Sequence, residues 1–158
     1  MTIQQTPGHV LPARSAAKME AAMAVGAFAI GTGEFAIMGL MPDIAQNLGL
    51  SEPQVGHAIS AYALGVMVGA PLLAILGAKL LRKHMLLLLM GLYALGNLAT
   101  AFTPTFGSLV AFRFISGLPH GAYFGIAAVV ASSMVPNDKR AGAVARVMMG
   151  LTLSLIHI

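Results

Sequence analysis

Three ionisable side chains lie inside long apolar runs, where a charge is costly. Glu34 lies in a run from residue 21 to 41, and Arg113 and His120 lie in a run from 107 to 135. A charge kept in such a run usually faces a bundle interior, a cavity or an opposite charge. A buried carboxylate beside an arginine can take up and release a proton, because burial favours its neutral form and the cation its ionised form. These residues predict proton-linked chemistry inside a membrane, with His120 as a further proton relay or substrate contact.

Glu34 and Arg113 are predicted to lie at nearly the same depth. Glu34 comes eight residues before Pro42 and Arg113 six residues after Gly107. At 1.5 Å per residue, they lie about 12 Å and about 9 Å below the same membrane surface. Pairing is geometrically possible, and protonation of Glu34 would then release Arg113. Two alternatives stay open: the pair is a fixed link between helices, and His120 is only hydrogen-bonded inside the bundle.

The composition indicates that a lipid bilayer surrounds these residues. Of the 158 residues, 58% are hydrophobic and 9% are charged, whereas soluble domains carry about 25% charged residues. The net charge of +4 comes from basic residues in short clusters between the apolar runs. That placement suits orientation in a membrane better than nucleic-acid binding. There is no cysteine, so disulfides and thiolate metal sites are excluded, and we expect neither metal nor cofactor.

The apolar runs predict an all-α polytopic membrane protein, because they recur at about the 20 residues that span a bilayer. Residues 1–20 are expected to form a polar tail, and 21–152 to hold four complete spans and the start of a fifth. The expected spans are about 21–41, 55–78, 85–102, 107–135 and 141–152 onward. The loops at 42–54 and 103–106 contain no Lys or Arg. By the positive-inside rule these loops face outward and the N-terminus is cytoplasmic.

Small residues spaced four apart predict close packing of helices. Gly65 and Gly69 share one face of the second span, and Gly117, Gly121 and Gly125 share one face of the fourth. Residues four apart lie on one face of an α-helix, and small residues there let membrane helices approach closely. We therefore interpret both stripes as packing features. Ser51 to Gln54 has the form of a capping box at the start of the second span.

The segment from Gly31 to Ala36 also satisfies the dinucleotide-binding pattern G-x-G-x-x-G/A. That pattern works between a strand and a helix of a parallel sheet. Here its flanks are apolar runs of membrane-spanning length, so a dinucleotide-binding enzyme is a remote alternative. No HExxH, GxSxG or Walker pattern occurs. We expect no enzyme and no catalytic residue.

Several short motifs occur together in the predicted spans. They are Gly31-Thr32-Gly33-Glu34-Phe35 and Gly39-Leu40-Met41-Pro42 in the first span, Tyr62-Ala63-Leu64-Gly65 and Gly69-Ala70-Pro71 in the second, and Leu109, Arg113 and Ser116 to Gly121 in the fourth. Over about residues 21–152 the chain resembles the first third of a major facilitator superfamily transporter. It is most similar to the arabinose-efflux-permease-like branch of the drug/proton antiporters.

This resemblance implies two six-helix halves that rock about a central cavity, which the first and fourth spans line in part. Glu34, Arg113 and His120 would face that cavity. The implied function is proton-coupled efflux of a small organic molecule, a sugar or a drug-like compound, across a bacterial-type inner membrane. A missing C-terminal part would complete the carrier. The alternative is a small four- or five-span structural or accessory membrane protein without transport.

One motif departs from the family pattern. The loop between the second and third spans keeps Gly77 and the basic residues Arg82 and Lys83. Four residues after this glycine the family usually has an aspartate, and here Leu81 stands in its place. The acid of the family's usual charge lock is therefore absent at this position.

The last six residues, Leu153 to Ile158, match the translation of a transposase end sequence used in sequencing libraries. We therefore expect the native sequence to stop near Thr152, with 153–158 as a non-native tail. These residues are also apolar enough to continue the fifth span, and that alternative stays open.

Overall fold

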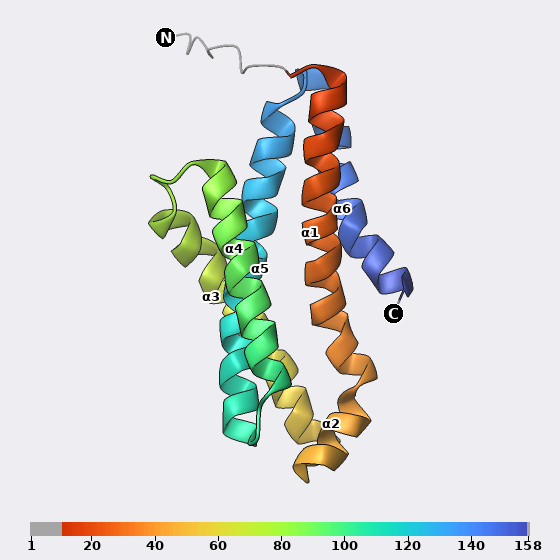
Figure 1. Cartoon of the computed structure of the whole chain (residues 1–158), viewed down its shortest axis with the longest axis vertical. Coiled ribbons are helices and arrows are strands. Elements are labelled where there is room, and N and C mark those ends of the chain that lie inside the picture. Colours follow the sequence, from red (N-terminus) through yellow and green to blue (C-terminus); the bar gives the residue numbers. More distant parts are fainter. Residues whose placement is uncertain (1–10, 158) are drawn as a thin grey trace.

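The computed structural model describes residues 11–157, and over this range the chain is helical without strands (Figure 1). The elements are α1 (Ala13–Gly39), α2 (Met41–Leu48), α3 (Glu52–Leu76), α4 (Arg82–Ala101), α5 (Phe106–Ser133), the 3₁₀ helix η1 (Asn137–Lys139) and α6 (Arg140–His157). Four of them, α1, α3, α4 and α5, are long and apolar enough to cross a membrane. The predicted all-α membrane fold is confirmed. Residues 1–10 of the predicted tail lie outside the described range.

Successive long helices run in opposite directions. In Figure 1 the start of α1 and the connection from α5 to α6 lie at the upper end, whereas α2 and the turn from α4 to α5 lie at the lower end. The upper end, with the turn from α3 to α4 on the same side, carries the basic residues outside α5, and we call it the basic end. These residues are Arg14, Lys18, Lys79, Arg82, Lys83, Lys139, Arg140 and Arg146.

Two predicted boundaries are wrong. The first long helix begins at Ala13, so residues 13–20 are helical where a polar tail was expected. The expected loop after Pro42 contains α2, a short helix with this proline in its first turn. It ends at Gly49, whose φ of 63° is left-handed, a conformation that glycine adopts without steric cost. The predicted capping box is present, and the Ser51 amide donates to Gln54 Oε1 over 2.9 Å.

The two stripes of small residues pack against each other where α3 meets α5. A Cβ atom added at Gly65 or Gly69 would overlap the carbonyl oxygens of Phe114 or Leu118, and one at Gly117 would overlap that of Tyr62. Because backbone faces backbone here, neither helix can give way. Gly121 also lies in this contact, since its added Cβ would come within 2.7 Å of the Ala70 methyl group.

The predicted stripe on α5 ends before Gly125. Nothing lies within 4 Å of a Cβ built at Gly125. This glycine borders a cavity of about 500 Å³ between α3, α4 and α5, together with Ala74, Gly77 and Arg82. In the structure it therefore packs against neither neighbouring helix.

Helix α1 packs mainly against α6, through small residues and an ion pair. Gly150 lies against the Ala24 carbonyl. Glu20 is only 4% exposed, and Arg146 donates to its two carboxylate oxygens over 2.6 and 3.0 Å. This ion pair is not among the contacts predicted from the sequence. Glu20 lay outside the predicted span because that span was started eight residues too late.

Helix α6 continues through residues 153–157. Ser154 is fully buried, with its Oγ 3.1 Å from Thr32 Oγ1 on α1. A native end near Thr152 stays a prediction, because an apolar segment can form this last turn whatever its origin.

Candidate functional site

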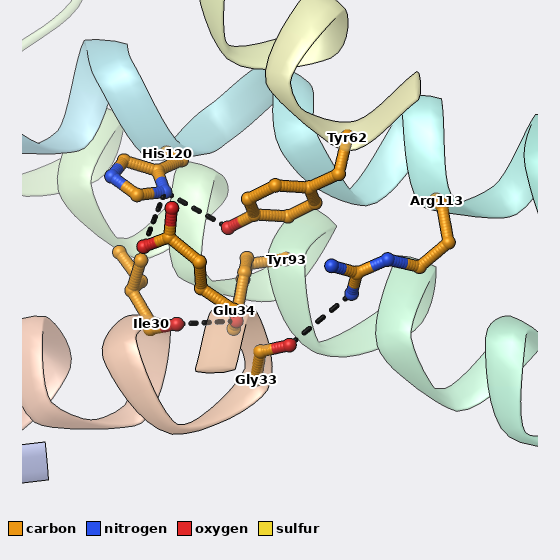
Figure 2. A network of polar contacts seen from close by, with 7 residues as sticks. All are labelled: Ile30, Gly33, Glu34, Tyr62, Tyr93, Arg113 and His120. Atoms are coloured by element: carbon orange, nitrogen blue, oxygen red, sulfur yellow. Dashed lines mark hydrogen bonds and ion pairs between the residues drawn. The ribbon is translucent and has the colours of Figure 1, made fainter. Parts of the chain in front are cut away.

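The predicted site residues come together where α1, α3 and α5 meet (Figure 2). Glu34 projects from α1, and Arg113 and His120 project from α5. The last two are seven residues apart, about two helical turns, so they share one face of α5. Tyr62 of α3 lies among them. The structure thus brings all three predicted ionisable residues to one region of the bundle.

Glu34 lies beside His120. Its Oε2 is 3.9 Å from His120 Nδ1, and the exposed fractions of the two side chains are 27% and 12%. The Tyr62 hydroxyl lies 2.8 Å from the same Nδ1. The Phe124 ring is a further neighbour of the imidazole, with 5.1 Å between ring centroids. His120 Nδ1 therefore has two polar neighbours within reach, a carboxylate and a phenol.

Arg113 is 2% exposed and makes one side-chain hydrogen bond among the described residues. Its Nη1 donates to the Gly33 carbonyl over 3.2 Å, whereas Nε and Nη2 are buried without a partner. Its guanidinium carbon lies 4.2 Å from the centroid of the Tyr62 ring. An aromatic face at this distance attracts a cation. Arg113 is thus held by a carbonyl and a ring, not by a carboxylate.

The predicted common depth agrees with the structure, and the direct pairing of Glu34 with Arg113, which the sequence left open, does not form among the described residues. Arg113 reaches the residue next to Glu34, which places the two at one level. Within residues 11–157, however, the ion-pair contact of Glu34 is with His120. Glu34 and Arg113 are therefore neighbours without being partners.

Two tyrosines fix the backbone of α1 around the site. Tyr93 of α4 donates to the Ile30 carbonyl over 2.8 Å, and Tyr123 of α5 donates to the Met23 carbonyl over 2.8 Å. Glycines of α1 make room for both, since a Cβ at Gly33 or Gly26 would overlap the hydroxyl of Tyr93 or Tyr123. These two buried bonds fix the position of α1 relative to α4 and α5. They thereby fix the level of Glu34 in the bundle.

The remaining predicted residues lie elsewhere. Gly77 ends α3, and Arg82 and Lys83 begin α4 at the basic end, with both side chains exposed. They take no part in the polar contacts of Figure 2. Gly31 to Ala36 lie inside α1, so the strand that a dinucleotide-binding loop follows is missing. Among residues 11–157 no three His, Asp or Glu side chains gather as metal ligands would.

Tyr62 and Tyr93 belong to the site but were not predicted for it. Tyr62 stood out only as part of the motif Tyr62-Ala63-Leu64-Gly65. A possible signal was its place three residues before Gly65, on the α3 face that approaches α5. Tyr93 had no signal, because a single tyrosine in an apolar run is ordinary.

Membrane-length helices of alternating direction define an all-α multi-pass membrane protein. The model of the Major Facilitator Superfamily matches residues 23–156, and the chain belongs to this family. The resemblance deduced from the motifs is thereby confirmed.

Three relatives illustrate the match. The chain is 50% identical over 135 residues to the inner membrane transport protein YdhP of Escherichia coli K12 (85% of this chain, 35% of YdhP). It is 41% identical over 137 residues to the putative transporter AraJ of the same strain (87% and 35%). It is 37% identical over 134 residues to the chloramphenicol resistance protein of Streptomyces lividans (85% and 34%). The chain spans about a third of the length of these relatives.

Proposed function

We propose that this chain is the first part of a secondary transporter that exports a small organic molecule in exchange for protons. Membership of the Major Facilitator Superfamily supports transport. The observation that carries the proton coupling is the contact of Glu34 with His120, 3.9 Å apart inside membrane-length helices. An ionisable group at such a position is a candidate for a proton or substrate pathway.

In this proposal Glu34 is the group that binds the coupled proton. Its carboxyl is partly exposed, so a proton can reach it. The two charge states differ in what they bind: the ionised form attracts a cation such as Arg113, whereas the neutral form binds only through hydrogen bonds. A ligand or proton can move a conformational equilibrium only through such a difference in binding. Arg113 supplies a fixed positive charge, and His120 and Tyr62 supply hydrogen-bonding groups next to the acid.

Two observations support efflux of a drug-like compound or a sugar. One relative is named a chloramphenicol resistance protein, and the motifs resemble the arabinose-efflux-permease-like branch. We also propose that the basic end faces the cytoplasm of a bacterial-type inner membrane. The length that the relatives have beyond this chain would supply the rest of the cavity.

The test is Glu34→Gln in a complete transporter that contains this sequence. We expect the variant to insert normally and to lose proton-driven efflux, measured in energised vesicles with chloramphenicol and a panel of sugars as test substrates. Energy-independent exchange of substrate should remain, because glutamine keeps the size and polarity of the side chain.

The matched control is Glu52→Gln, the same change at an exposed position in the first turn of α3. This variant should transport like the wild type. Efflux by Glu34→Gln at the wild-type rate would reject Glu34 as the coupling group.

A further inference from the structure

Arg113 is a buried cation with a carboxylate nearby to which it does not bind. Its Nη1 bonds to the carbonyl of Gly33, the residue before Glu34, and its Nε and Nη2 have no partner among the described residues. A buried guanidinium without a counter-charge is unfavourable, because one carbonyl and an aromatic ring offset only part of its cost of desolvation. Among the described residues, Glu34 instead makes its ion-pair contact with His120.

Tyr62 contacts both the cation and the neighbour of the acid. The face of its ring contacts Arg113, whose guanidinium carbon is 4.2 Å from the ring centroid. Its hydroxyl lies 2.8 Å from His120 Nδ1, which in turn is 3.9 Å from Glu34 Oε2. Figure 2 marks the contacts of His120 with Tyr62 and with Glu34, and the separate contact of Arg113 with the Gly33 carbonyl. One side chain thus contacts the cation with its ring and, through the histidine, reaches the acid with its hydroxyl.

Tyr62 itself has little freedom to leave this position. It is 2% exposed, and its backbone carbonyl lies directly against Gly117 of α5. The tight contact of α3 with α5 therefore fixes the start of the side chain, and the His120 hydrogen bond fixes its end.

We propose that Tyr62 is a positioning residue whose ring keeps Arg113 from forming an ion pair with Glu34. Glu34 then has two competing partners: His120 while the ring is in place, and Arg113 once the ring is displaced. Within a transporter this choice would decide whether Glu34 is free to take up a proton, a consequence that rests on the function proposed above. The spacing role itself is a property of the structure and is testable without transport.

The test is the reactivity of Glu34 with dicyclohexylcarbodiimide, an apolar reagent that modifies protonated carboxyls inside membranes. The complete transporter in membranes is treated with the reagent, and modification of Glu34 is followed by mass spectrometry. In Tyr62→Ala we expect Glu34 to react roughly tenfold more slowly than in the wild type, because Arg113 then holds it ionised; tenfold corresponds to about 1.4 kcal/mol. In Tyr62→Phe, which keeps the ring, the rate should stay near that of the wild type.

The direction of the change separates this role from a general packing role. If Tyr62 only filled space, its removal would open the site and speed up the reaction. The double variant Tyr62→Ala with Arg113→Gln should regain fast modification, since the competing cation is gone. Tyr62→Leu, closer in volume to tyrosine, replaces Tyr62→Ala if the latter does not fold.

Three results would overturn the proposal. They are unchanged or faster modification of Glu34 in both ring-less variants, equally slow modification in Tyr62→Phe, and a wild-type Glu34 that the reagent does not modify at all. The first result would mean that the Tyr62 ring does not keep Arg113 from Glu34. The second would assign the effect to the Tyr62 hydroxyl, and the third would mean that Glu34 is already held ionised in the wild type. None of these depends on efflux, so failure here and failure of the Glu34→Gln test are distinguishable.

Discussion

His120 is the residue through which the acid and the tyrosine of the site are connected. Its Nδ1 has a carboxylate oxygen at 3.9 Å and a phenol oxygen at 2.8 Å. The imidazole can serve in two ways, as a hydrogen-bonding group of fixed position or as a group that itself carries a proton. The short distance to Tyr62 favours the first role.

A pair of variants separates the two roles of His120. We expect His120→Ala to lower proton-driven efflux by more than about tenfold, because Glu34 and Tyr62 lose a shared neighbour worth about 1.4 kcal/mol. His120→Asn should keep most of the activity, since its amide can occupy the place of Nδ1 without titrating. Efflux assays in energised vesicles provide the measurement. An equal loss in both variants would show instead that the imidazole must carry a proton.

At the scale of single residues, the sequence predicted which ionisable side chains lie in the site. It did not predict which groups these side chains contact. Glu34, Arg113 and His120 were visible because each interrupts an apolar run. Tyr62 was not, because an aromatic residue does not interrupt such a run, and its contact with His120 joins residues 58 positions apart. The common depth of Glu34 and Arg113 left their pairing open, because depth alone does not show which groups each side chain contacts.

At the scale of helices, the site depends on how closely α3 approaches α5. Gly65, Gly69 and Gly117 allow direct backbone contact, and this contact places Tyr62 over Arg113. The spacing of four residues was sufficient to predict the packing stripes. It could not show where the helices diverge, and Gly125 lies beyond that point.

Two identical substitutions test this packing. Gly69→Ala should destabilise the protein by roughly 1–3 kcal/mol, since its methyl group meets the backbone of Leu118 and cannot be accommodated by a side-chain rotation. Gly125→Ala should be neutral or slightly stabilising, because the space around it is open and alanine favours the helix by up to about 1 kcal/mol. Thermal unfolding midpoints in detergent provide the comparison. Equal midpoints would mean that the α3–α5 contact is looser than the structure shows.

The boundaries of the helices were less predictable than their existence. A hydropathy pattern locates the apolar centre of a helix, but α1 extends into a polar segment at its start. Helix α2 is not predicted from the sequence because its eight residues are too few to give a membrane-length signal. Pro42 stands in its first turn, where proline is tolerated.

At the scale of the whole molecule, the basic residues outside α5 gather at one end of the bundle. The sequence predicted this grouping from the alternation of basic and uncharged connections, because each spanning helix reverses the direction of the chain. The structure has the same alternation of directions.

The predicted orientation can be measured with single cysteines, since this sequence has none. Gln46→Cys in α2 should react with a membrane-impermeant maleimide in intact cells, and Ala78→Cys at the basic end should react only after permeabilisation. Both positions are exposed in the structure. A complete transporter with its other cysteines replaced is the suitable background. Labelling of Ala78→Cys alone in intact cells would reverse the topology.

The division of the helices into two groups sets a condition on any movement within this part of the protein. Helices α1 and α6 form one group, tied by the Glu20–Arg146 ion pair and the Gly150 contact, and α3, α4 and α5 form the other. Polar contacts link the groups through the carbonyls of Met23, Ile30 and Gly33 and through Glu34 with His120. If one group slides or tilts against the other, these contacts stretch together. The Glu34 carboxylate therefore lies at the boundary between the two groups of helices. A change in its charge and a change in the angle between the groups would alter the same contacts.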